Sequence, residues 1–266
     1  MKKRALYPVY LCLILIIIYI PILLVIIYSF NQSRLSSIWS GFSLRWYREL
    51  FMDRSMFEAL RNSLVLALLT SFFSAIIGTL GAAGIVRRTP GATGKSIEYL
   101  SILPIMTPEI ILGMIFLAFF SFLSLPAGMV TLVIAHTAFC VPYVYLLVKA
   151  RLAGLDKSYI EAARIMGAAD VRAFYDITLP LVLPAVVSGM LISFAMSFDD
   201  VIISVFVAGV NTNTLPMKIY TQIKTGVTPK TNAMCTLIFL LTVIICAAAF
   251  AFARRLKNHH SSQQKT

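Results

Sequence analysis

Six long apolar blocks run through this sequence and leave little polar surface for a soluble fold. A bilayer core about 30 Å thick needs roughly 20 apolar residues for each helical span. Charged residues make up 13% of the chain, whereas a soluble domain carries about 25%. We therefore expect an all-α integral membrane protein with about six transmembrane helices, forming a single domain over residues 1–266. The blocks predict spans at Tyr7–Phe30, Leu60–Ile85, Ile97–Phe122, Gly128–Val148, Leu181–Ala208 and Ala233–Phe252.

The basic residues indicate how these helices are oriented. With a cytoplasmic N-terminus, the cytoplasmic segments carry 15 of the 23 Lys and Arg residues, in agreement with the usual excess of positive charge inside. We therefore expect both termini in the cytoplasm. The net charge of +12 then reflects topology and anionic lipid head groups, and nucleic-acid binding is not expected. The four cysteines lie in apolar spans without CxxC spacing, so neither a metal site nor a cofactor is expected.

The polar segment between the fourth and fifth spans is predicted to form two short cytoplasmic helices. Ser158 followed three residues later by Glu161 fits a capping box, which starts a helix. Gly167 suits the left-handed position just after a helix end. Asp170 is placed to cap a second short helix, which Pro180 limits. These local signals predict a helical hairpin and by themselves name no partner.

The same segment, residues 151–180, resembles the EAA loop of bacterial ABC importer permeases. The resemblance rests on Glu161-Ala162-Ala163, then Gly167, then Ile177-x-Leu179-Pro180, at the family's own spacing. It implies that the first short helix sits in a groove of a separate ATPase subunit and transmits its closure. The small side chains of the two alanines leave room for a partner's backbone, and Glu161 offers a charge to an adjoining cation or helix end. The implied coupling residues are Glu161, Ala162, Ala163, Gly167, Asp170, Ile177, Leu179 and Pro180.

Five further stretches are similar to the spermidine/putrescine importer family, and within it to the second of the two permease subunits. This resemblance implies a five-helix core preceded by one N-terminal helix, in a bacterial inner membrane. It also implies polyamine import together with two copies of an ABC ATPase subunit, a second, homologous permease subunit and a periplasmic polyamine-binding protein. The stretches are YIPILLVIIYSFNQSR (Tyr19–Arg34), GFSLRWYREL (Gly41–Leu50), MTPEIILG (Met106–Gly113), SFDDVIISVFVAG (Ser197–Gly209) and LPMKIYTQIKTGVTPKTNA (Leu215–Ala233).

One stretch, TPGATGKS at Thr89–Ser96, ends like a phosphate-binding loop. That motif needs a glycine at the position of Thr89 and a strand before it, whereas a membrane helix precedes it here. We therefore expect a transport subunit that is not an enzyme, with ATP hydrolysed by a partner.

Three acidic residues lie in or at the edges of the predicted spans: Glu109, Asp199 and Asp200. A carboxylate in hydrocarbon costs about 2.5–3.5 kcal/mol on insertion scales, so such groups usually face a cavity or a partner. Pro108 predicts a bend that exposes backbone to the path beside Glu109. Neighbouring helical residues point about 100° apart, so at most one of the two aspartates faces the path directly, and helix capping is the alternative. Ser197 is either a path residue or a small packing residue.

Two aromatic residues and one histidine complete the candidates. Trp46 and Tyr47, in the first external loop, are suited either to stacking on an ammonium group or to an interfacial aromatic belt. His136, in the middle of the fourth span, is expected to form hydrogen bonds between helices rather than to relay protons.

Two other functions fit parts of this pattern. An ABC importer permease for another amine, an anion or iron has the same architecture, and the intramembrane acids favour a cation. An ion-coupled secondary transporter is less favoured, because such carriers often show paired repeats. This chain has no evident repeat and does have the EAA loop.

Overall fold

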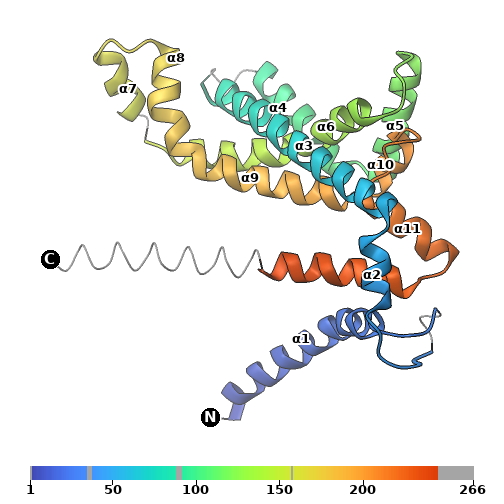
Figure 1. Cartoon of the computed structure of the whole chain (residues 1–266). Helices are drawn as coiled ribbons and strands as arrows, with labels where there is room; N and C mark the ends of the chain where they lie inside the picture. The colour runs from blue at the N-terminus through green and yellow to red at the C-terminus, as the bar shows by residue number, and fades with distance from the viewer. Residues whose placement is uncertain (1, 35–37, 88–91, 157, 245–266) are drawn as a thin grey trace. The chain divides into compact units, whose positions relative to one another are not determined.

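The computed structural model describes residues 2–34, 38–87, 92–156 and 158–244 (Figure 1). Within these ranges the regular secondary structure is helical, apart from an isolated β-bridge between Asn31 and Phe42, and turns and loops join the helices. The all-α prediction is therefore confirmed. The chain forms two compact units, one of Met1–Arg54 with Thr221–Thr266 and one of Ser55–Tyr220.

The first unit begins with α1 (Lys2–Tyr28), and most of the apolar side chains of residues 10–28 are exposed. No residue of its spanning window is buried, as is typical of a helix that is apolar all round and crosses a membrane. The short helix α2 (Arg45–Phe51) and the apolar helix Pro229–Ile244 also belong to this unit. An ion pair between Lys230 and Asp53 ties that apolar helix to the turn after α2.

The second unit is built around α6 (Met129–Ala153). This helix packs along α9 (Leu179–Asp199) and against α3 (Arg54–Arg87). Between α3 and α6, the Ser74 hydroxyl donates a hydrogen bond to the Thr137 carbonyl at 3.4 Å. The central helix therefore contacts both α3 and α9.

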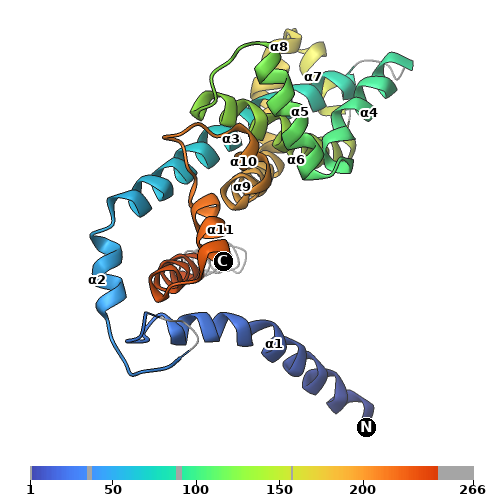
Figure 2. The ribbon, with the colours of Figure 1, turned by 90° about the vertical axis from the view of Figure 1, so that its right-hand side faces the viewer.

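The third predicted span, Ile97–Phe122, is broken. Its two parts, α4 (Ala92–Met106) and α5 (Glu109–Phe122), are bent by 110° at a break that includes Pro108. Figures 1 and 2 show the two helices running in different directions. Proline lacks an N–H donor and disfavours helical backbone in the residue before it. The predicted bend is confirmed, but the segment is either a broken span or a re-entrant pair and not one straight helix.

The fifth predicted span begins earlier than expected. α8 (Asp170–Ala173) continues through the π-helix η1 (Phe174–Thr178) into α9 without interruption. The prediction that Pro180 limits a separate short helix is therefore wrong. The Leu179 N–H bonds to the carbonyl five residues back, and this widened turn accommodates the proline ring in a continuous helix.

The same span also ends earlier than expected. α9 stops at Asp199, Asp200 is extended, and the short helix α10 (Ile202–Val207) follows. Buried apolar side chains of α6 form one cluster with α5 and α10 and another with α3 and α9. α7 (Ser158–Ile165) precedes α8, and α11 (Leu215–Thr225) follows α10. In Figure 1, α7 and α8 lie at one end of α9 and α10 lies at the other.

Within the described ranges, four helices are long and apolar enough to cross a membrane, and the α4–α5 pair makes a fifth if it is one span. The sixth predicted span, Ala233–Phe252, corresponds to the helix Pro229–Ile244, and its later residues lie outside the described ranges. Met1 and residues 245–266 also lie outside them, as do residues 88–91 in the glycine-containing loop. The orientation of both termini and the single-domain description stay predictions.

Candidate functional site

The coupling segment begins with a capped helix, α7. Asp156 Oδ1 accepts a hydrogen bond from the Ser158 N–H at 2.9 Å, and this bond holds the pKa of the Asp156 carboxyl below its usual range. The helix starts where the sequence predicts. Its capping oxygen, however, belongs to Asp156, and Ser158 is itself helical.

Gly167 ends α7 in the predicted left-handed conformation, with φ of +83°. Its N–H bonds to the Arg164 carbonyl at 2.9 Å, and the Ala168 N–H bonds to the Ala163 carbonyl at 3.0 Å. These two bonds are the pair that defines a Schellman motif. The direction of the chain after α7 is thus fixed by a backbone conformation that favours glycine.

The two alanines of the motif lie in different environments. Ala162 is exposed, whereas Ala163 is 8% exposed in a helix that contacts α8 and η1. Ala163 therefore serves packing within the segment. The surface open to a partner carries Glu161 and Ala162, together with the exposed Ile165 and Met166.

Asp170 ties the two parts of the segment together. It is the first residue of α8 and not its cap, which is Ala169, so the predicted capping role is wrong. Its carboxylate instead accepts a hydrogen bond from Arg164 Nε at 3.0 Å. The three remaining motif residues lie in the continuous helix after α8, with Ile177 and Leu179 half-buried and Pro180 exposed.

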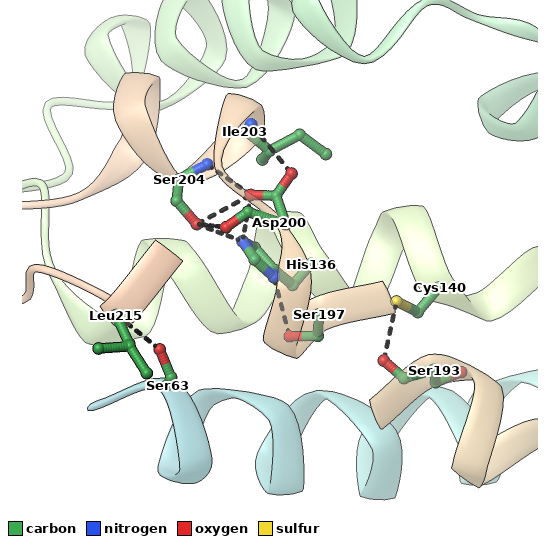
Figure 3. A network of polar contacts seen from close by, with 9 residues as sticks. All are labelled: Ser63, His136, Cys140, Ser193, Ser197, Asp200, Ile203, Ser204 and Leu215. Carbon is green, nitrogen blue, oxygen red and sulfur yellow. Dashed lines mark hydrogen bonds and ion pairs between the residues drawn. The ribbon is translucent and has the colours of Figure 1, made fainter. Parts of the chain in front are cut away.

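At the other end of α9, Asp200 is buried and caps α10. Its carboxylate accepts hydrogen bonds from the Ile203 N–H (3.2 Å), the Ser204 N–H (2.8 Å) and the Ser204 hydroxyl (2.8 Å), as Figure 3 shows. The first N–H groups of a helix have no partners within the helix, and this carboxylate satisfies two of them. Helix capping, the alternative weighed for Asp200, is the role that this geometry supports.

His136 joins α6 to both sides of the α9–α10 break. Its Nδ1 lies 2.9 Å from Ser197 Oγ on α9, and its Nε2 lies 3.2 Å from Ser204 Oγ and 3.4 Å from Asp200 Oδ2. The imidazole is fully buried. His136 is thus the interhelical hydrogen-bonding residue that the sequence predicts, and the hydroxyl of Ser197 is engaged by it.

Two acidic residues predicted to line the path, Asp199 and Glu109, are not buried. Asp199, the last residue of α9, is exposed, and Glu109, the first residue of α5, is half-buried. Glu109 is close enough to Asp199 and Asp200 for their charges to interact. The fold therefore brings the three acids into one region, with Asp200 used internally and the other two available.

Trp46 and Tyr47 lie on α2 in the first unit, where both take part in packing. The Trp46 Nε1–H donates to the Asn31 carbonyl at 2.6 Å, and the Arg45 guanidinium lies 5.2 Å from the indole centroid. The Tyr47 hydroxyl is 2.7 Å from Ser29 Oγ. Both side chains hold the loop after α1, and a role in ammonium binding stays a prediction.

Sequence reasoning missed the Asp156 cap and the pairing of His136 with Asp200. It also missed an ion pair between Lys149 of α6 and Glu98 of α4. An aspartate two residues before a predicted helix start was an available signal for the first. The other two join helices that are far apart in the sequence, for which one sequence carries no local signal. In the described part of the chain, no group of three or more His, Cys, Asp or Glu residues is arranged to hold a metal ion.

The four long apolar helices and the bent α4–α5 pair in the described part of the chain are those of a multi-pass membrane protein. The chain belongs to the family described as binding-protein-dependent transport system inner membrane component, whose model matches residues 74–259. The prediction of an importer permease is therefore confirmed at the level of the family.

Two similar proteins have been assigned to polyamine transport. The chain is 40% identical over 229 residues to the putrescine transport system permease protein PotI of Escherichia coli K12, covering 83% of this chain and 81% of that protein. It is 37% identical over 244 residues to the spermidine/putrescine transport system permease protein PotC of Haemophilus influenzae, covering 91% and 93%.

Solved structures support the fold. A bacterial ABC transporter involved in the import of the acidic polysaccharide alginate matches with a TM-score of 0.75 and 14% identity, over 94% of this chain and 96% of that chain. The MetNI methionine ABC transporter matches with a TM-score of 0.62 and 20% identity, over 80% and 96%. At these identities, the matches establish the fold alone.

Proposed function

We propose that this chain is the membrane-spanning permease subunit of an ATP-driven importer for polyamines such as spermidine and putrescine. The observation that carries the proposal is the identity of 36–40%, over most of the chain, to permeases named for putrescine and spermidine/putrescine transport. The half-buried Glu109 and the exposed Asp199 support a cationic cargo. Carboxylates in a membrane are costly unless they face a cavity or an opposite charge, and protonated amines supply that charge.

The coupling segment is the proposed contact with the ATPase. α7 is capped at both ends and is tied to α8 by the Arg164–Asp170 pair. Its last residue, Ile165, and the next residue, Met166, have exposed apolar side chains. A rigid helix that docks through an apolar end can transmit the movement of the ATPase to the rest of the permease. A flexible loop would absorb that movement. Closure of an ATPase subunit on α7 would thereby move α9, because α8, η1 and α9 form one continuous helix.

The remaining partners follow from the same proposal. A translocation path with alternating access needs two permease halves, here this chain and a homologous second subunit, with two ATPase copies in the cytoplasm. A periplasmic binding protein delivers the polyamine. Both termini and α7 are then cytoplasmic, and the protein lies in the bacterial inner membrane.

The test is transport by the reconstituted complex. The chain is purified with the proteins encoded beside it and placed in liposomes with ATP on the side of the ATPase. Uptake of labelled spermidine and putrescine and stimulated ATP hydrolysis are measured, with sulfate, ferric iron and methionine as alternative cargoes. Polyamine uptake that needs both ATP and the binding protein is expected. Stimulation by an anion or by iron, with none by an amine, would overturn the cargo assignment.

A further inference from the structure

The break between α9 and α10 is held by one side chain from a third helix. His136 of α6 contacts Ser197 before the break and both Asp200 and Ser204 after it (Figure 3). All four side chains are buried. A break in a membrane helix leaves backbone groups that must find partners within the protein, and this cluster supplies them for the first turn of α10.

The hydrogen bonds of the cluster form a consistent set. The Ser204 hydroxyl donates to Asp200 Oδ2, so its oxygen can accept a hydrogen bond from His136 Nε2–H. His136 Nδ1 is then the acceptor for the Ser197 hydroxyl. This assignment, made from the network, uses a neutral imidazole with both nitrogens occupied. A side chain with one donor and one acceptor in this geometry fixes the direction of both helices.

The change of chain direction between α9 and α10 decides which aspartate is exposed and can bind a substrate. Asp199 and Asp200 are neighbours, and residue 200 leaves the helix in an extended conformation. Its carboxylate turns back onto α10, while that of Asp199 stays exposed. α10 also packs on α5, where a Cβ added at Gly113 would lie 2.5 Å from the Phe206 ring. A change in the direction of α10 would therefore displace α5 and, with it, Glu109.

We propose that His136 is a positioning residue for substrate selection: by bridging Ser197 to the Asp200–Ser204 pair, it fixes the α9–α10 break and keeps Asp199 directed toward the transported amine. The inference rests on the proposed function. His136 does not touch the substrate, and it acts through the placement of Asp199. Loss of the imidazole should alter the KM for the amine and not only the amount of folded protein.

A double-mutant cycle tests this inference in the assembled complex. The four forms are the parent, His136→Phe, Asp199→Asn and the double variant, and labelled spermidine uptake is normalised to assembled complex. Each single change is expected to lower uptake at subsaturating spermidine by about tenfold, the loss of one charged hydrogen bond. The double variant is expected to be lowered by about tenfold as well, and not by the hundredfold that independent sites would give.

The matched control is Cys140→Ala. Cys140 is buried on the same helix one turn later and bonds weakly to the Ser193 carbonyl at 3.6 Å, outside the cluster. The fold-losses of spermidine uptake caused by Cys140→Ala and by Asp199→Asn should multiply in the double variant, as they do for independent sites. If the His136→Phe complex does not assemble, Ser197→Ala and Ser204→Ala are used instead, because each removes one hydrogen bond to the imidazole. Their losses of uptake should likewise not multiply with that of Asp199→Asn.

The outcomes separate the two proposals. Multiplying effects of His136→Phe and Asp199→Asn, or no effect of Asp199→Asn, would overturn the positioning role while leaving polyamine import intact. A parental complex that carries no polyamine would instead reject the proposed function. Coupled losses, with a raised KM for spermidine, support the positioning role.

Discussion

The Val144 side chain on α6 occupies the space beside Gly189 on α9. A Cβ added at Gly189 would lie 3.0 Å from Val144 Cα and 3.2 Å from its methyl carbons. On α3, a Cβ added at Gly78 would lie 2.8 Å from Val144 Cβ. Small residues let membrane helices approach closely, so the three central helices of the second unit meet at this valine.

Enlarging Gly78 should therefore separate α3 from α6. Gly78→Leu is expected to destabilise the fold by about 1–3 kcal/mol, as overpacking does in cores, and to lower the amount of protein that survives heating in detergent. The control is Gly84→Leu on the same helix, where an added Cβ meets nothing within 4 Å. Equal survival of the two variants would argue against close α3–α6 packing.

Gly167 should be intolerant of a β-branched residue. Its φ of +83° costs other residues roughly 1–2 kcal/mol, so Gly167→Val should redirect the chain after α7 and lower uptake while the protein still inserts. Gly154→Val is the matched control, because Gly154 has φ of −89° and an added Cβ would make only ordinary contacts. Parental uptake by membrane-inserted Gly167→Val would count heavily against the docking role of the segment.

The two alanines of α7 should respond differently to a large side chain. Ala162→Trp places the indole on the exposed surface, so the segment should stay folded while copurification of the ATPase is lost. Ala163→Trp forces the indole into the packed side of α7, so the segment itself should become sensitive to protease. Full ATPase copurification with Ala162→Trp would remove this surface from the proposed interface.

The topology prediction can be tested with single cysteines in a background without the four native ones. Gly154 and Asn213 are both exposed, so burial within the chain does not confuse the result. In intact cells, a cysteine at Asn213 should react with an impermeant thiol reagent and one at Gly154 should not. The reverse pattern would place α7 outside and exclude contact with a cytoplasmic ATPase.

The sequence predicted the parts of this molecule that depend on local chemistry. Apolar block length located the spans, Pro108 located the bend beside Glu109, and Gly167 located the left-handed residue after α7. Residue type alone did not predict the continuous helix through Pro180, because a π turn can absorb a proline that would stop a regular helix.

The polar contacts of the path candidates were less predictable. Asp199 and Asp200 are identical residues at adjacent positions, yet Asp199 is exposed whereas Asp200 bonds to the first turn of α10 and lies 3.4 Å from Nε2 of His136, a residue distant in the sequence. A single sequence does not report such a contact. The expectation that at most one of the two aspartates faces the path directly stays a prediction. Asp200 is extended and not helical, so the 100° spacing of helical neighbours does not describe this pair.

The acidic residues should accordingly divide into two classes when neutralised one at a time. Glu109→Gln and Asp199→Asn keep side-chain size and remove an accessible charge, so spermidine uptake per assembled complex should fall by about tenfold to 150-fold, corresponding to roughly 1.5–3 kcal/mol for a charged hydrogen bond. Asp200→Asn turns an amide donor toward groups that already donate, so it should lower the amount of assembled complex. Quantitative immunoblots and labelled uptake on the same vesicles separate these effects. Unchanged assembly of Asp200→Asn would refute its capping role, and parental uptake by both Glu109→Gln and Asp199→Asn would leave the cationic path without support from the fold.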